Sequence, residues 1–170
     1  MSGSFHCGCI NVRVEFAKWI SKISHIIKHL TTVVVGGKGK VSIDNFYQAI
    51  AEEALASAQN IDGRLLVYSE IEDGVVSADL FYVQSSDSKI RFRFGSSQIK
   101  DLIVSFWEAW RGTPGNREWR VMTFVIEGGA FNIDFNYPDQ IDEDEDLSDR
   151  RPRVIKRYFG DSLVDYSNPR

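Results

Sequence analysis

The sequence predicts an α+β domain with helices packed on one face of a mostly antiparallel sheet of about five strands, in the order α-β-β-β-α-β-β-α. Strand-like runs come in two groups, and short turns join the strands within each group. Apolar stripes at helical spacing lie before, between and after these groups. Because the links are short, we expect neighbouring strands to pair antiparallel.

The length of 170 residues suits one domain, with room for an additional arm. Hydrophobic residues make up 43% and charged residues 26%, which is typical of a folded globular chain. No stretch is apolar for long enough to predict a membrane-spanning helix. Two cysteines are too few for a secreted disulfide scaffold.

Residues 1–40 are interpreted as a basic N-terminal arm with a net charge of +5. A glycine-rich linker at 36–39 separates it from a single domain at 41–170. The spacing of apolar residues in the arm predicts an amphipathic helix. This helix could pack on the domain at 41–170 or rest on an anionic membrane. Its apolar face comprises Phe16, Trp19, Ile20, Ile23, Ile26, Ile27 and Leu30. The arm does not resemble a secretory signal, because lysines interrupt its apolar stretch.

The first half of the domain predicts one helix and three strands. The helix begins at a Ser42 or Asp44 cap and ends near residue 59. The strands are expected at residues 64–71, 75–83 and 89–94. Asp73-Gly74 between the first two strands is a hairpin signal, because both residues tolerate positive φ.

The second half predicts a helix, a hairpin and a short terminal helix. The helix starts at Ser96 or Ser97 and ends at the turn over residues 112–115. Strands at 118–127 and 130–136 are joined by two glycines, which favour a tight hairpin. After an acidic loop comes an amphipathic segment whose apolar residues are Val154, Ile155, Tyr158 and Phe159.

The domain at 41–170 has a net charge of −9 and contains neither histidine nor cysteine. It therefore lacks the residues of a Ser–His or Cys–His catalytic site, and we expect no enzyme of those kinds. Much of its negative charge lies in one run: Asp139, Asp142, Glu143, Asp144, Glu145, Asp146 and Asp149. Such a surface suits a cationic protein partner and not nucleic acid.

The acidic run could be a solvated loop or a docking surface for a basic protein. A calcium-binding EF-hand loop starting at Asp142 would need glycine at its sixth position and glutamate at its twelfth. The sequence has Leu147 and Arg153 there, so the EF-hand interpretation fails.

The strand at 130–136 offers three small polar side chains on one face, Asn132, Asp134 and Asn136, which could bind a partner or face water. A zinc site could use His6, Cys7, Cys9, His25 and His29, which are all in the arm. Their spacing does not match that of structural zinc sites, and we expect neither a metal nor a cofactor.

The C-terminal third resembles the YezG-type family of bacterial immunity proteins. The resemblance is carried by a tryptophan-led strand at 119–127, a glycine hairpin, the stretch FNIDFNYPD at 131–139 and the closing stretch RVIKRYFGD at 153–161. It is strongest over residues 119–161. The arm at 1–40 has no counterpart in it.

The resemblance implies a non-catalytic cytoplasmic antitoxin whose partner is the C-terminal domain of a cognate polymorphic toxin, commonly a nuclease. It implies no small-molecule substrate, and it marks Asp134 and Asp139 as motif positions. Our physical argument adds the loop acids Asp142, Glu143, Asp144, Glu145 and Asp146 as toxin-binding residues. A nuclease is cationic where it binds phosphate, so an acidic loop can occupy that surface.

Two other functions remain open at this point. A metal-dependent enzyme would use the carboxylates of Glu127, Asp134, Asp139 and the acidic loop. A membrane-peripheral adaptor would use the basic arm.

Overall fold

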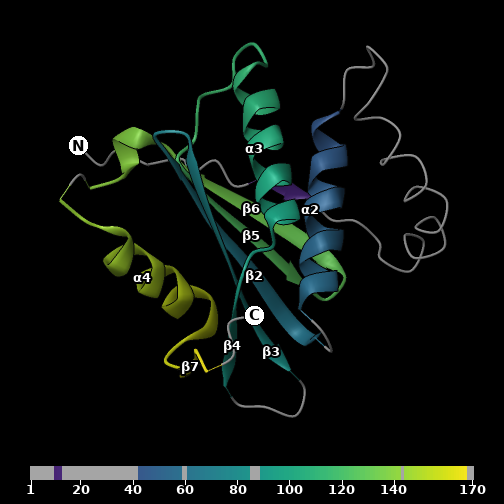
Figure 1. Ribbon diagram of the computed structural model, residues 1–170, viewed down its shortest axis with the longest axis vertical. Helices are drawn as coiled ribbons and strands as arrows, with labels where there is room; N and C mark the ends of the chain where they lie inside the picture. Colours follow the sequence, from purple (N-terminus) through teal and green to yellow (C-terminus); the bar gives the residue numbers. More distant parts are fainter. Residues whose placement is uncertain (1–9, 13–41, 59–60, 85–88, 143, 168–170) are drawn as a thin grey trace, which may run out of the picture.

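The computed structural model describes residues 10–12, 42–58, 61–84, 89–142 and 144–167 (Figure 1). The expected arm helix and the linker at 36–39 lie outside this part of the chain. The class predicted from the sequence is confirmed, because the described residues form an α+β fold with a mostly antiparallel sheet.

The sheet has seven strands in the order β1-β6-β5-β2-β3-β4-β7 across the described residues. Every pairing is antiparallel except β4 with β7. The strands are β1 (Ile10–Val12), β2 (Ile61–Glu72), β3 (Val75–Gln84), β4 (Ile90–Phe94), β5 (Val121–Glu127), β6 (Ala130–Asn136) and β7 (Val164–Asp165). The expected count of about five omits β1 and β7, the short strands at the two edges.

The two strand groups have the predicted connections. β2, β3 and β4 form an antiparallel meander, and β5 and β6 form a hairpin. Asp73 and Gly74 both have positive φ at the tip of the first hairpin, as do Gly128 and Gly129 at the second. Pairing of β5 with β2 joins the groups into one sheet.

Helices α2 (Ile43–Ser57) and α3 (Ser97–Arg111) cover one face of the sheet (Figure 1). Ser42 and Ser96 cap them, each accepting a backbone N–H with its side-chain oxygen. Their apolar stripes, including Ile50 and Phe106, pack on alternate residues of the strands, such as Val67 and Phe124.

Helix α4 (Leu147–Phe159) packs on the opposite face, so the prediction that all helices share one face is wrong (Figure 1). The reason is that the central strands are apolar on both sides. Leu66, Phe81 and Val125 alternate with the residues of the first core and form a second core with Ile155.

The acidic run is also not one continuous loop. The 3-10 helix η1 (Pro138–Gln140) follows β6 directly, and α4 already begins at Leu147, within the run. Its acids are therefore held in several different local structures. Among the helices of the described residues, none is long and apolar enough to cross a membrane.

Candidate functional site: an acidic groove at one end of the sheet

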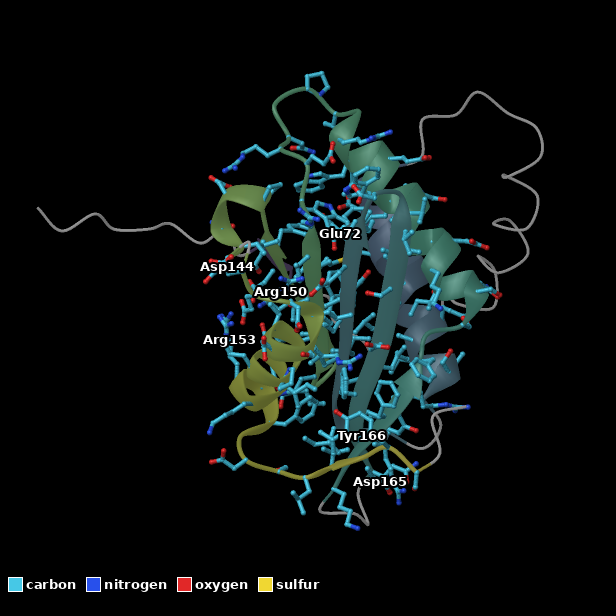
Figure 2. All side chains as sticks on the ribbon, turned by 60° about the vertical axis from the view of Figure 1, so that its left-hand side comes forward. Glu72, Asp144, Arg150, Arg153, Asp165 and Tyr166 are labelled. Atoms are coloured by element: carbon cyan, nitrogen blue, oxygen red, sulfur yellow. The ribbon has the colours of Figure 1, made fainter. Side chains whose placement is uncertain are left out.

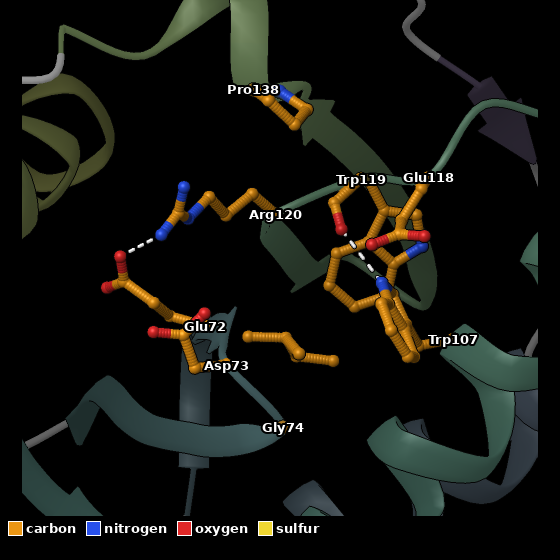
Figure 3. A pocket seen from close by; sticks show the side chains of 9 residues that line it. Glu72, Asp73, Gly74, Trp107, Glu118, Trp119, Arg120 and Pro138 are labelled. Atoms are coloured by element: carbon orange, nitrogen blue, oxygen red, sulfur yellow. Dashed lines mark hydrogen bonds and ion pairs between the residues drawn. The ribbon is translucent and has the colours of Figure 1, made fainter.

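Two adjoining hollows lie where the β2–β3 hairpin, the start of β5 and the segment before α4 meet. Their volumes are about 260 and 440 Å³, and they share Glu72, Arg120 and Pro138. The smaller one is drawn in Figure 3. Together they form what we call the acidic groove. Its charged lining residues are Glu72, Asp73, Glu118, Arg120, Asp142, Asp144, Glu145, Asp146 and Arg150.

The charge of this groove is strongly negative, because seven acids face two arginines. Both arginines already bind carboxylates of this chain. Arg120 pairs with Glu72, and Arg150 pairs with the buried Glu70 at 2.9 Å. Figure 2 shows Glu72, Asp144 and Arg150 on the same side of the molecule. Beyond Ile141 and Glu145 the depression continues beneath α4, where further arginines line it.

Asp134, a predicted toxin-binding residue, is buried and is 3% exposed. The Tyr158 hydroxyl donates a 2.7 Å hydrogen bond to Asp134 Oδ2, and Arg157 Nη2 lies 3.7 Å from the same oxygen. Since α4 covers this carboxylate, Asp134 holds the helix on the sheet and cannot contact a partner directly. The same face of β6 was expected to present an accessible polar ladder, and at Asp134 this expectation is wrong.

Asp139 is exposed, but it is bound within the chain. Arg117 Nη2 lies 2.5 Å from Asp139 Oδ1, and the Arg117 guanidinium stacks 4.5 Å from the centre of the Tyr137 ring. This group sits beside Pro138 at the border of the acidic groove. Asp139 therefore lies near the groove without lining it, and Arg117 neutralises its charge.

Asp142 and Asp144 are exposed in the groove, as is Asp146 among the described loop acids. The Asp144 backbone N–H donates a 3.1 Å hydrogen bond to Asp142 Oδ1, which fixes the turn between them. Glu143 lies outside the described residues.

Glu145 and Asp146 have structural contacts that the sequence pattern did not indicate. Glu145 is only 12% exposed and forms an ion pair with Arg153. Asp146 is the N-cap of α4 and accepts hydrogen bonds from the Ser148 hydroxyl at 2.6 Å and backbone N–H at 2.7 Å. These two bonds hold the pKa of the Asp146 carboxyl below its ordinary value.

Buried carboxylates on the sheet are the largest feature that sequence reasoning missed. Arg150 donates two hydrogen bonds to Glu70, at 3.1 and 2.9 Å, and Arg151 donates one to Asp79 at 2.6 Å. The pKa of the Arg150 guanidinium is raised, chiefly by its hydrogen bonds to Glu70. Burial raises the pKa of the Tyr68 hydroxyl, and its hydrogen bond to Glu70 adds to this effect. A signal was present in the sequence, since Glu70 lies between the apolar run at 65–68 and Ile71 in the same strand.

The groove also contains three acids that lie far from the acidic run in the sequence. Glu72 and Asp73 come from the β2–β3 hairpin, and Glu118 precedes β5. Their wall is completed by Trp107 and Trp119. No local pattern links these residues, because only the paired strands bring them together.

The carboxylates named for a metal-dependent enzyme do not converge. Glu127 binds Arg64 through both of its oxygens, Asp134 lies beside Arg157, and Asp139 binds Arg117. Glu127 and Asp139 stand at opposite ends of the β5–β6 hairpin. In the part of the chain that the structure describes, no group of three or more His, Cys, Asp or Glu residues is placed to hold a metal ion. The histidines and cysteines of the arm lie outside that part.

A comparison with models of known protein families finds no match to this chain, and a search of curated proteins finds no relative.

Proposed function

We propose that this protein is a cytoplasmic immunity protein that binds and neutralises a cognate toxin domain of basic charge, through the acidic groove. The observation that carries the proposal is the groove itself, whose seven acids are opposed by two arginines that already have partners. A concave surface of one sign attracts and orients a partner of the opposite sign.

A nuclease domain is the kind of toxin that fits best. Nucleases bind phosphate with clustered lysine and arginine residues, and the same residues would be attracted to the groove. The groove repels nucleic acid for the same reason. Acting as an inhibitor needs no catalytic group, which agrees with a domain that contains neither histidine nor cysteine.

The residues proposed to contact the toxin differ from the set expected from the sequence. Asp142 and Asp144 are retained, with Asp139 at the border. Glu72, Asp73 and Glu118 are added because they line the same groove. The remaining described acids of the original set, which are Asp134, Glu145 and Asp146, stabilise α4.

The test needs the cognate toxin domain, which is to be sought among the products of the adjacent genes, and it consists of two measurements. The full chain should form a complex with that domain and protect cells that express it. Failure to bind this domain, or binding without protection, would contradict the immunity function.

A double variant, Asp142→Asn with Asp144→Asn, tests the role of the groove. We expect its association rate to fall by about tenfold at low salt and to depend less on ionic strength, since steering by charge is weakened. The measurement is surface plasmon resonance over a series of salt concentrations. The control is Asp101→Asn with Glu108→Gln, which removes the same charge from the exposed surface of α3. Equal rates for the two variants would exclude steering by the groove.

A further inference from the structure

The smaller hollow of the acidic groove has an aromatic wall and an acidic rim (Figure 3). Trp107, Trp119 and Ile71 provide its apolar surface, and Glu72, Asp73 and Glu118 provide its carboxylates. Its volume of about 260 Å³ is below the range of about 300–1,000 Å³ that is usual for small-molecule sites. It therefore suits one inserted side chain better than a separate ligand.

The aromatic wall is rigid. The Trp107 indole N–H donates a 2.8 Å hydrogen bond to the backbone carbonyl of Trp119 (Figure 3). Trp119 is 1% exposed, and its ring packs against Phe106 and Phe135. A side chain that enters the hollow would meet a surface that needs no rearrangement, which lowers the entropy cost of binding.

The three carboxylates of the rim differ in how far they are neutralised. Glu72 is paired with Arg120, which also lines the hollow (Figure 3). Asp73 has no hydrogen bond or ion pair with any described residue. Glu118 lies 4.0 Å from Arg111, at the limit of an ion pair, and is 58% exposed. Asp73 and Glu118 therefore leave negative charge available at the mouth.

Two arginines of this chain each lie on an aromatic ring and beside a carboxylate, which is the arrangement that the hollow offers to an incoming arginine. Arg111 stacks 4.3 Å from the centre of the Trp107 ring and faces Glu118. Arg117 stacks over Tyr137 and pairs with Asp139. In both cases a guanidinium lies on an aromatic ring and next to a carboxylate. Arg111 does not line the hollow, so its stacking leaves the hollow open.

We propose that this hollow is a socket for an arginine side chain of the basic partner. The socket deepens the proposed function and rests on it, because it names the group by which the toxin domain would be anchored. The guanidinium packs against Trp107 while its N–H groups bind Asp73 and Glu118. A planar group with several donors matches both surfaces, which an ammonium does only in part. Arginine is also a common anchor residue at protein interfaces.

The experiment is an NMR titration of the full, isotope-labelled chain with Nα-acetyl-arginine amide. We expect saturable, millimolar binding that shifts the Trp107 indole N–H and the amides of Asp73 and Gly74. Nα-acetyl-citrulline amide has the same shape without the charge and should not bind. Shifts that spread over the surface without saturation, or equal shifts with the citrulline probe, would overturn the socket.

A pair of isosteric variants tests the rim. Asp73→Asn with Glu118→Gln should weaken binding of the arginine probe about fivefold or more, since two charged contacts are lost. Asparagine tolerates the positive φ at this position, so the hairpin is preserved. The control, Asp101→Asn with Glu108→Gln, should bind as the natural chain does. Unchanged binding in the Asp73/Glu118 variant would overturn the socket.

The same variants separate the two proposals when the cognate toxin domain is used as the ligand. If the toxin domain binds the Asp73/Glu118 variant as tightly as the natural chain, the socket is wrong and the immunity function stands. If the toxin domain does not bind the natural chain, while the arginine probe binds saturably, the immunity function is wrong and the socket stands.

Discussion

At the residue scale, the acids of this protein divide into two sets. Glu70, Asp79 and Asp134 are buried on the sheet, and each contacts a side chain of α4. Burial of a carboxylate is unfavourable unless a cation or hydrogen-bond donor compensates it. These three acids therefore contribute to stability, whereas Asp73, Asp142 and Asp144 in the groove are exposed and available to a partner.

The buried pair between Arg150 and Glu70 gives a prediction for stability. Arg150→Met leaves the Glu70 carboxylate buried without its cation, so the free energy of unfolding should fall by about 3 kcal/mol. Urea unfolding, followed by tryptophan fluorescence, measures this change.

A double variant separates the missing charge partner from lost packing. Arg150→Met combined with Glu70→Leu should recover most of the loss, since an apolar pair can replace a buried ion pair. If the double variant is less stable than Arg150→Met alone, then the unpaired carboxylate is not the cause of the loss.

The partners of single acids could not be predicted from the sequence. Asp139 and Asp142 belong to one acidic run, yet Arg117 binds the first and a backbone N–H binds the second. Arg117 lies 22 residues before Asp139 in the sequence and reaches it only in the folded structure. The sign of the surface was therefore predictable, but the acids that contribute to it were not.

At the scale of elements, the beginning of α4 shows how packing on the sheet outweighs local sequence features that favour a loop. Asp146 is a good N-cap and Ser148-Asp149 suits a first turn, but the acidic run and Pro152 favour a loop. The helix forms because Val154, Ile155 and Tyr158 pack on the second core, while its arginines bind the sheet acids.

The N-cap gives a prediction about pH. Asp146→Ala should lower the melting temperature at neutral pH, because α4 loses its side-chain cap. The pKa of Asp146 is lower in the folded state, so its stabilisation is complete above the unfolded-state pKa. That stabilisation is lost as the pH falls through the folded-state pKa.

The melting temperatures of the natural chain and of this variant should therefore converge in acid. Circular dichroism across a pH series measures both. A difference that stays constant down to the lowest pH at which the chain is folded would contradict this role of the Asp146 carboxylate.

Strand β7 gives a prediction for the sheet edge. It pairs with β4, and Arg91 contacts Asp165 while Phe92 contacts Tyr166. Asp165 and Tyr166 are labelled at the lower end of the molecule in Figure 2. A chain that ends after Gly160 exposes the edge of β4 and the Phe92 ring. We expect a lower melting temperature and more self-association, because uncovered edge strands pair with other chains.

Light scattering and thermal unfolding measure the effect of this truncation. A chain that ends after Ser167 keeps β7 and serves as the control. A truncated chain that stays monomeric and equally stable would show that β7 does not protect the edge.

At the scale of the whole molecule, the sequence predicts the individual strands and hairpins better than the way they pack together. The two strand groups and their hairpins follow from local alternation and from glycine positions. The pairing of β5 with β2 and the second helical face depend on contacts between distant segments, for which a single sequence contains no direct signal. The groove was missed for the same reason, since its walls come from four separate stretches of the chain.

The separation of the two acid sets has a consequence for how such a protein can change over generations. The carboxylates of Glu70, Asp79 and Asp134, which bind α4 to the sheet, are buried, while Glu72, Asp73, Asp142 and Asp144 lie at or beside turns at the end of the sheet. Substitutions at these turns alter the surface without disturbing the core. A new binding specificity can therefore arise by a few exchanges at the rim, while the scaffold beneath it keeps its stability.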